Sequence, residues 1–455
     1  MNESGSPVIV IGAGISGLAC AYALRNFGID AILLESSPRP GGVIRSEQRD
    51  GFLFECGPQS FTSTFSLASL AQQLTLDNEL VQAPPRAPRY VLVNGALQPV
   101  PLSPSAFLST SLVGLGTKWS ILSEPLRKTS PPENDESIAD FTRRKFTDEL
   151  LDRLVGPFVS GIYAGDPEKL SLRGAFPALH QAERSAGSLV RGIIRNAKQR
   201  QGPSHKATLA SFRHGIETLA RALAEKLGPA LRTRSEVREL RGSGASFHIA
   251  VQENGSAREY TASRIVLAAP AGIAARLIKD ILPAPSSALS EITYAPVAVV
   301  SLGYRRQDVG HPLSGFGFLI PRSAGLRTLG SVWNSSLFPN RAPEDHVLLT
   351  SFVGGATDPR AIDTSPDQLA SLVHTELAGL LSLRQFPVIT NVTVYRQAIP
   401  QYNLGHSQRV ASIESARASC PNLWILGNFF RGPAIGACVD RALSIAEQVR
   451  ISYNS

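Results

Sequence analysis

The chain opens with apolar runs separated by a helical repeat, a pattern typical of a parallel β-sheet flanked by helices. Val8–Ile11 is an uninterrupted apolar run, as expected for a strand that is buried on both faces. Apolar residues then recur at helical spacing over residues 16–27, and Gly28 is placed to end that helix. A second apolar run, Ala31–Leu34, follows. This opening therefore predicts a strand, a helix and a parallel strand.

The pattern changes repeatedly further along the chain. The stretch "APRYVLVNGALQPVPL" predicts a β-hairpin with Asn94-Gly95 as its two-residue turn. Residues 104–200 have a mostly helical pattern, and residues 198–207 resemble a linker. Residues 235–265 predict short antiparallel strands that end in the buried strand "RIVLAAP". Residues 290–405 mix strands with a helix near 367–382, and "NLWILGNF" and "IGACVDRALSIAEQVR" predict a closing strand, glycine turn and helix.

Composition narrows the class of protein. A chain of 455 residues is long enough for two or three lobes. The net charge of +8 favours anionic lipid or a carboxylated ligand over nucleic acid, because neither an RNA-binding aromatic signature nor zinc-finger spacing is present. No apolar run reaches the roughly 18 residues of a membrane span, and no secretion signal is expected at the N-terminus. A cytoplasmic protein is predicted, with peripheral membrane contact left open.

The cysteines give no sign of a metal site or a disulfide framework. Cys20, Cys56, Cys420 and Cys438 form no CxxC pair and no cluster with metal-ligand spacing. We therefore expect four free thiols in a reducing compartment, with Cys20 buried in the first helix.

Three glycines after the first strand form the pattern GxGxxG: Gly12, Gly14 and Gly17. Gly12 permits a tight turn, Gly14 lets the backbone approach a pyrophosphate, and Gly17 allows close helix–strand packing. The helix N-terminus offers N–H groups to phosphates. Glu35, at the end of the second strand, is placed to accept hydrogen bonds from a ribose. The pattern predicts a dinucleotide site without distinguishing FAD from NAD.

The next stretch, "ESSPRPGG", resembles the second fingerprint of FAD enzymes of the amine-oxidase superfamily, with Arg39, Gly41 and Gly42 at the matching positions. Val43 stands where that superfamily often has an arginine. The C-terminal "LGNFFRGPAIGACVDRALSIA" resembles the superfamily's closing turn and helix, with Asn428 in place of its usual acidic residue. The resemblance implies an FAD cofactor contacted by Gly12, Ala13, Gly14, Ile15, Ser16, Gly17, Glu35, Ser36, Arg39, Gly41, Gly42, Val43, Gly57, Pro58, Gln59, Ser60, Val237, Gly427, Pro433, Ala434 and Ile435.

A mid-chain segment, "FVSGIYAGDPEKLSLRGAFPAL" (158–179), matches no general fold signal. It is similar to a segment of the oxygen-dependent protoporphyrinogen oxidases. Stretches such as "GGVIRSEQRDGFLFECGPQSF", "RYVLVNGALQPVP", "SLFPNRAPEDHVLLTSFVGGA" and "QAIPQYNLGH" agree, so the resemblance covers nearly the whole chain. Together with the element pattern it implies an α/β fold in which a Rossmann-type FAD-binding domain is interleaved with a mixed-sheet substrate domain and a helical insert. The expected segments are 1–85, 204–285 and 406–455 for the FAD-binding domain, 86–103 and 286–405 for the substrate domain, and 104–203 for the insert.

The resemblance also implies a site for a large reduced tetrapyrrole with propionate side chains. Arg89 matches a family arginine that pairs with a propionate, and guanidinium–carboxylate pairs are charge-assisted. Leu319, Val332 and Phe352 match apolar residues that hold the ring. Gly161 matches a position where backbone approaches the substrate, which a residue without a Cβ permits. Each of these residues, taken alone, is equally typical of a strand edge, a core or a turn.

The implied reaction is the oxidation of protoporphyrinogen IX to protoporphyrin IX, in which three dioxygen molecules are reduced to hydrogen peroxide. The flavin carries the redox chemistry, so no catalytic residue and no metal ligand is assigned. Coproporphyrinogen III is the alternative substrate, and an amine oxidase, a carotenoid desaturase or a non-catalytic porphyrin-carrying flavoprotein are more distant alternatives. A homodimer and transfer of the product to a chelatase stay open. The stretch "PLSPSAFLSTSLVGLGTKWSIL" fits an interfacial helix or a core helix equally well.

Overall fold

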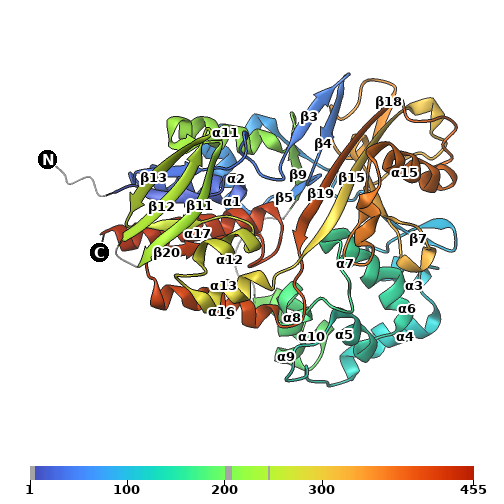
Figure 1. The fold of residues 1–455 in the computed structure, drawn as a ribbon. Coiled ribbons are helices and arrows are strands. Elements are labelled where there is room, and N and C mark those ends of the chain that lie inside the picture. Colours follow the sequence, from blue (N-terminus) through green and yellow to red (C-terminus); the bar gives the residue numbers. More distant parts are fainter. Residues whose placement is uncertain (1–5, 200–207, 244–245, 455) are drawn as a thin grey trace.

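The computed structural model describes residues 6–199, 208–243 and 246–454. A Rossmann-type sheet with its helices, a second and longer-stranded sheet, and a helical insert below the second sheet can be followed in Figure 1. Residues 200–207, which include most of the predicted linker, lie outside the described residues.

The Rossmann-type sheet has five parallel strands that come from three separated parts of the sequence. Their order across the sheet is β10 (Leu231–Arg232), β2 (Ala31–Leu34), β1 (Val8–Ile11), β14 (Ile265–Leu267) and β20 (Leu423–Ile425). All residues of β1, β14 and β20 are buried, as their uninterrupted apolar runs predicted. The predicted interleaved α/β fold is confirmed.

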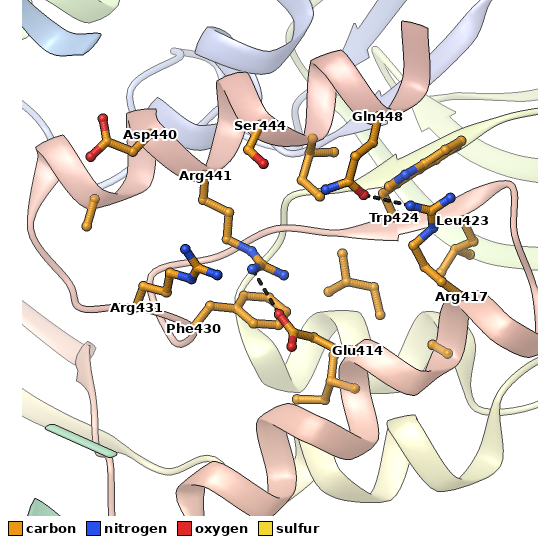
Figure 2. A pocket seen from close by; sticks show the side chains of 15 residues that line it. Glu414, Arg417, Leu423, Trp424, Phe430, Arg431, Asp440, Arg441, Ser444 and Gln448 are labelled. Carbon is orange, nitrogen blue, oxygen red and sulfur yellow. Dashed lines mark hydrogen bonds and ion pairs between the residues drawn. The ribbon is translucent and has the colours of Figure 1, made fainter. Parts of the chain in front are cut away.

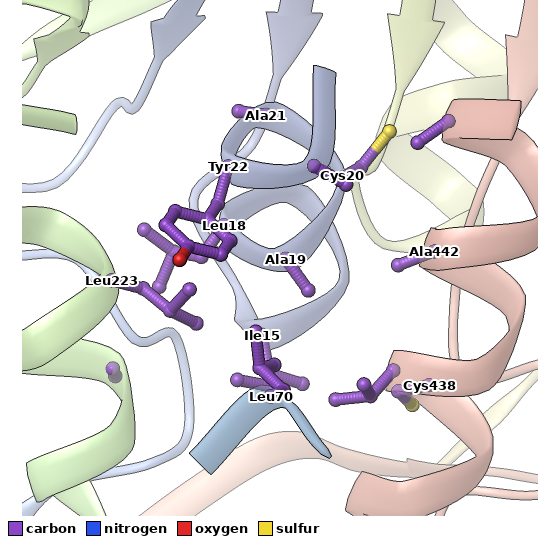
Figure 3. Packing of buried hydrophobic residues seen from close by; sticks show 14 of the residues in the cluster. Ile15, Leu18, Ala19, Cys20, Ala21, Tyr22, Leu70, Leu223, Cys438 and Ala442 are labelled. Carbon is purple, nitrogen blue, oxygen red and sulfur yellow. The ribbon is translucent and has the colours of Figure 1, made fainter. Parts of the chain in front are cut away.

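Helices cover both faces of this sheet. On one face lie α1 (Ile15–Asn26), α2 (Phe65–Gln73), α11 (Glu217–Leu227) and α17 (Ile435–Asn454). Figure 3 shows α1 between α11 and α17, with Cys20, Leu18 and Ala19 inside the cluster. On the other face lie α12 (Ala271–Ile278), α13 (Pro283–Ser290), α16 (His406–Ser419) and an antiparallel sheet of β11 (Ser235–Ser243), β12 (Ser246–Glu253) and β13 (Ser256–Ala262). All four cysteines are free thiols and Cys20 is buried, as predicted, and the other three are buried as well.

The second sheet has seven strands and takes its members from the two segments expected for a substrate domain. Their order is β19 (Ile389–Pro400), β15 (Tyr294–Arg305), β18 (His346–Gly354), β17 (Thr328–Trp333), β16 (Gly317–Leu319), β7 (Arg89–Val93) and β8 (Ala96–Pro99). The predicted hairpin is present, because Asn94 and Gly95 both have positive φ in a two-residue turn between β7 and β8. One face of the sheet packs on α15 (Pro366–Leu381), which begins with a capping box from Ser365 and Gln368.

The insert is a helical layer that is fixed internally by buried charges. Its elements are α3 (Pro104–Ser109), α4 (Leu115–Ser123), η2 (Glu124–Leu126), α5 (Ile138–Lys145), α6 (Asp148–Leu150), a π-helical turn (Leu151–Val155), α7 (Gly156–Tyr163), α8 (Leu172–Ala175), α9 (Pro177–Ala186) and α10 (Leu189–Gln199). Lys145 Nζ lies 2.9 Å from Glu124 and 3.1 Å from Glu183, and all three side chains are buried. Glu124 also accepts hydrogen bonds from the first N–H groups of α10. This network joins four of the insert's elements.

Shorter elements connect these layers. They are β3 (Ser46–Arg49) with β4 (Phe52–Glu55), the small sheet of β5 (Phe61–Thr62), β9 (Leu209–Phe212) and β6 (Leu80–Gln82), α14 (Asn334–Leu337), and the 3₁₀ turns η1 (Asp77–Glu79), η4 (Gly228–Ala230), η5 (Arg306–Asp308), η6 (Arg322–Ala324) and η7 (Pro359–Asp363). Among the helices of the described residues, none has both the length and the apolar character that crossing a membrane requires.

Candidate flavin and substrate site

The glycine turn after β1 has room for a ligand at one position and for nothing at the other two. A Cβ on Gly12 would lie 2.6 Å from a backbone carbonyl that follows β14, and one on Gly17 would lie 1.9 Å from the carbonyl oxygen of Gly12. A Cβ on Gly14 would meet no atom within 4 Å. Gly14 is also the N-cap of α1 and supplies no side-chain cap, so the N–H groups of Ile15 and Ser16 stand where a phosphate would bind.

Glu35 lies at the end of β2 with its carboxylate already engaged by backbone. One oxygen accepts the N–H of Ala13 at 2.7 Å, and the other accepts that of Ser37 at 2.8 Å and faces the Ser36 hydroxyl at 3.4 Å. A carboxylate has about four lone-pair sites, so it retains acceptor capacity for a ribose. Val237 is buried near this point, in a strand whose first residue donates to the Glu35 carbonyl at 2.7 Å.

The double-glycine loop passes directly beside the glycine turn. Gly41 and Gly14 form a parallel β-bridge, and a Cβ on Gly42 would lie 3.4 Å from the Cα of Gly14. Both loop glycines have positive φ, which is strained for a residue with a side chain. The Arg39 guanidinium donates to the carbonyl oxygens of Gly42 at 2.6 Å and Ile44 at 3.1 Å. Arg39 therefore braces this loop in addition to placing positive charge near the predicted pyrophosphate.

The run of residues 57–60 joins this loop to the second sheet. A Cβ on Gly57 would lie only 2.1 Å from the carbonyl oxygen of Val43, so the two backbones are in contact. The Gln59 side chain accepts a hydrogen bond from Asn334 Nδ2 at 2.7 Å, directly after β17. The predicted flavin-binding run is thus connected to the strand that carries Val332.

The loop before α17 is held by a stacked Tyr402–His406 pair, with ring centroids 4.1 Å apart. The Tyr402 hydroxyl donates to the carbonyl oxygen of Asn428 at 2.6 Å and accepts the N–H of Gly432 at 2.7 Å. His406 Nε2 lies 2.8 Å from the carbonyl oxygen of Phe429. Burial lowers the pKa of His406 to about 4, so the ring is neutral near pH 7 and donates from Nε2.

This loop carries the last predicted flavin contacts. Gly427 begins it, and a Cβ there would lie 2.1 Å from the ring of Phe429. Pro433 is half-buried and Ala434 is exposed, directly before Ile435 begins α17. The loop ends therefore have little freedom, while residues 433–434 keep a surface open to a ligand.

The predicted substrate residues of the second sheet share one face. Arg89, Gly317 and Val332 are direct partners across β7, β16 and β17. Leu319 and Phe352 lie in the neighbouring row, joined through Gly330 of β17. Residues two apart along a strand, and direct partners across strands, point to the same side of a sheet. The structure therefore brings Arg89, Leu319, Val332 and Phe352 together on the face opposite α15.

The apolar members of this face are half-buried although their strands are central, which indicates that the face is not filled by packing. Gly161 lies inside α7, not in a turn, and a Cβ there would lie 2.8 Å from Leu319 Cδ2. The Arg89 guanidinium lies 5.2 Å from the Phe316 ring centroid, and among the described residues no carboxylate pairs with it. The face thus combines an apolar surface with an available cation.

Sequence reasoning missed the side chains that connect these parts. Gln401 donates to the carbonyl oxygen of Tyr163, the last residue of α7, at 2.8 Å, while its neighbour Tyr402 holds the loop before α17 (residues 427–434). Both residues stand in the stretch "QAIPQYNLGH", which was used only as part of the resemblance. The available signal was the pair Gln401-Tyr402 between the end of a strand and Gly405. The helix that contacts Leu319 and the loop at α17 are therefore fixed to one short segment.

Fold and site together define a flavin-containing oxidoreductase. The family model of the flavin-containing amine oxidoreductases matches residues 15–449, and the chain belongs to that family. A crystal structure of a protein from Exiguobacterium sp. 255-15 superposes with a TM-score of 0.82 at 24% identity, covering 98% of this chain and 99% of that one. Cyclohexylamine oxidase from Brevibacterium oxydans has the same fold, with a TM-score of 0.73 at 18% identity and coverage of 99% and 100%.

Within the family, the chain is similar over almost its full length to two kinds of porphyrinogen-oxidising enzyme. It is 33% identical to the chloroplastic protoporphyrinogen oxidase of Nicotiana tabacum, over 97% of this chain and 85% of that protein. It is 31% identical to the coproporphyrinogen III oxidase of Bacillus subtilis, over 97% of both chains. The resemblance inferred from the sequence motifs is confirmed.

Proposed function

We propose that this chain binds FAD and oxidises protoporphyrinogen IX to protoporphyrin IX, with reduction of three dioxygen molecules to hydrogen peroxide. The observation that carries the proposal is the single sheet face that presents Arg89 beside Leu319, Val332 and Phe352. A large apolar ring with carboxylate side chains is the ligand that fits this combination. Similarity to protoporphyrinogen oxidases over 97% of the chain supports it.

The residues present fit a flavin dinucleotide. Open space at Gly14, the uncapped start of α1 and the positive-φ loop at Gly41 would hold the pyrophosphate, Glu35 the ribose, and residues 433–435 the ring. A bound FAD would supply the acceptor for the substrate's electrons, with dioxygen as the final acceptor.

The chain's own contribution is orientation. Arg89 would bind a propionate and fix the position of the tetrapyrrole, because a guanidinium and a carboxylate form a directional, charge-assisted pair. Leu319, Val332 and Phe352 would hold the ring and exclude water from one of its sides. Gly161, inside α7 and in close contact with Leu319, would let the helix backbone approach the ring.

Coproporphyrinogen III is the second candidate substrate, favoured by the end-to-end match with the Bacillus subtilis enzyme. It carries four carboxylates where protoporphyrinogen IX carries two. The rate at which each porphyrinogen reduces the flavin distinguishes the two candidate substrates. The holoprotein is mixed anaerobically with each porphyrinogen, bleaching of the flavin absorbance is timed, and oxygen is then admitted while porphyrin fluorescence is recorded. Faster bleaching by protoporphyrinogen IX supports the first candidate and the reverse order the second. Absence of bleaching with both overturns the porphyrinogen oxidase proposal.

We further propose that the insert contacts an anionic lipid surface. Trp119 of α4 is 71% exposed and Leu126 of η2 is 86% exposed, so these two side chains lie outside the core, although Leu112 and Val113 before α4 are buried. The adjacent α10 exposes Ile193 and Ile194 beside the cation Arg195. Exposed aromatic and aliphatic side chains with neighbouring cations are typical of interfacial helices.

Co-sedimentation with vesicles tests this contact. The wild-type chain is expected to sediment with vesicles of phosphatidylglycerol and phosphatidylcholine, and less with phosphatidylcholine alone. The double variant W119S/L126S is expected to stay in the supernatant while keeping its flavin spectrum. Equal sedimentation of variant and wild type would contradict the proposal.

A further inference from the structure

A cavity of about 510 Å³ lies at the free edge of β20 between α16 and α17, away from the substrate face of the second sheet, with Phe430 and Arg431 of the loop before α17 at one end. Figure 2 shows its lining, with α17 above, α16 below and the edge strand behind. Pockets of this size hold compounds of the size of ordinary metabolites. Its walls come from Ile413, Ala416, Leu423, Ile425 and Ile445 between two polar ends.

The polar side chains of the cavity carry an excess of positive charge. Arg417, Arg431 and Arg441 line it, and Glu414 is the carboxylate that pairs inside it, with Arg441 at 3.1 Å. Asp440, the other acidic lining residue, accepts a hydrogen bond from Thr64 outside the cavity and points away in Figure 2. Glu414 pairs with Arg441, so Arg417 and Arg431 have no acidic partner among the described residues.

The cavity also has donors without acceptors. Trp424 is fully buried, and its Nε1–H has no hydrogen-bond partner among the described residues. The Nε–H groups of Arg417 and Arg441 are also buried and unpartnered. Buried N–H groups are nearly always paired, so three of them around one cavity point to acceptor atoms supplied from outside the chain. Burial and the charge of Arg431 lower the pKa of Arg441, which an added anion would reverse.

The cations stand at two separated ends. Arg441 and Arg431 lie at one end, where Arg441 stacks 3.5 Å from the centroid of the Phe430 ring. Arg417 lies at the other end, bound to Gln448 at 2.6 Å and facing the Trp424 ring. Arg441 and Gln448 are seven residues apart on α17, which corresponds to roughly 10 Å along a helix axis. A ligand that satisfies both ends needs two anionic groups about that far apart.

We propose that this cavity is a second ligand site of the chain, for a small organic dianion with an apolar middle. One carboxylate or phosphate group binds Arg431 and Arg441, and the other binds Arg417 beside Trp424. The aliphatic walls contributed by β20, α16 and α17 contact the part between them. The proposal does not depend on which porphyrinogen the chain oxidises, because none of these residues lies on the substrate face of the second sheet.

Calorimetric titration of the flavin-loaded protein tests the site with defined probes. Biphenyl-4,4′-dicarboxylate carries two carboxylates on a rigid apolar body, biphenyl-4-carboxylate carries one, and inorganic phosphate has no apolar part. The dicarboxylate is expected to bind at one site per chain, at least about tenfold more tightly than either control, because only it engages both ends. Equal affinity for all three, or no binding of any, would overturn the proposal.

Substitutions of the cavity's arginines test whether the dicarboxylate binds there. R417A removes the cation at one end, and R431A removes an exposed loop cation at the other without disturbing a hydrogen bond of the described residues. Each is expected to weaken the dicarboxylate about tenfold or more, to the level of the monocarboxylate. R450A, on α17 but outside the cavity, is the matched control and is expected to bind as wild type. Flavin absorbance and thermal unfolding establish that each variant is folded. Binding that survives both R417A and R431A places the ligand elsewhere and refutes the assignment.

Discussion

Replacement of Tyr402 by phenylalanine removes the hydrogen bonds that hold the loop of residues 427–434 and keeps the ring that packs beneath it. Tyr402 is 1% exposed, and its ring stacks on His406 in a way that phenylalanine preserves. Burial raises the pKa of Tyr402 far above its ordinary value, so its hydroxyl stays neutral and serves as donor and acceptor. The substitution leaves the carbonyl of Asn428 and the N–H of Gly432 without their partner. Asn428 and Gly432 are half-buried, and each backbone group left unpaired there costs up to about 1–3 kcal/mol.

Two measurements follow from this. Urea unfolding of the flavin-free Y402F variant is expected to show a loss of up to about 2–6 kcal/mol in the free energy of unfolding. Without these hydrogen bonds, the loop of residues 428–434 is less ordered before flavin binds. If ordering it then costs about 1.4 kcal/mol of binding free energy, the dissociation constant for FAD rises about tenfold. Calorimetric titration of the flavin-free protein with FAD measures this rise.

The control lies in the other sheet. Tyr304 is also fully buried, and its hydroxyl bonds His374 Nδ1 at 3.0 Å on the α15 side of the sheet. Y304F is expected to lose stability but to bind FAD as wild type. Unchanged FAD affinity in Y402F, or an equal loss of affinity in both variants, would refute the role given to the loop.

Three further results are expected. Removal of the cation in R89A should raise KM for the porphyrinogen about 10- to 100-fold with a small change in kcat, because a charge-assisted pair contributes about 1.5–3 kcal/mol; an unchanged KM in steady-state oxygen uptake would contradict this. G14A should fold normally but lose FAD in a spectral titration, because a Cβ at Gly14 meets no protein atom within 4 Å and would occupy the predicted phosphate site. G17A should be destabilised in thermal unfolding, because a Cβ at Gly17 would lie 1.9 Å from the carbonyl oxygen of Gly12. The opposite pattern would place the pyrophosphate elsewhere. Burial raises the pKa of Glu55 from 4.5 to about 7, so the fold binds its proton more tightly than the unfolded chain does and stability falls as pH rises through this window. Urea unfolding at pH 5 and pH 8 should show a decline of up to about 3 kcal/mol that is absent in E55Q, and an identical decline in both proteins would assign it to other groups.

The sequence predicted the Rossmann-type elements well because their signals are local. The signals are the buried run Val8–Ile11, the glycine turn and Gly28 after α1. Each depends on the conformation or burial of the residues themselves and not on distant parts of the chain. Asn94-Gly95 predicted the hairpin for the same reason. The helical insert could be predicted as helical, but the bounds of its individual helices could not. Those bounds depend on buried pairs such as Lys145–Glu183 that join distant positions.

The residues of the candidate site were predicted through the resemblance. The contacts that position them could be seen only in the structure. Gly161 gave no sign that it lies inside α7 against Leu319, because that contact joins a helix and a strand distant in sequence. The hydrogen bonds of Tyr402 to the loop at 428–432 are likewise non-local. The exposure of Trp119 could not be derived from its amphipathic neighbours, since a core helix shows the same pattern.

The order of strands in the Rossmann-type sheet governs how this polypeptide can be made. Val10 pairs with Val266, and the strand beyond it, β20, is translated near the end of the chain together with α17, on which α1 rests. The first unit to leave the ribosome therefore carries an open strand edge and an uncovered apolar helix through most of synthesis. Pairings of such high contact order form slowly, and exposed edges aggregate, so we expect nascent chains of this protein to depend on chaperones until the last helix emerges.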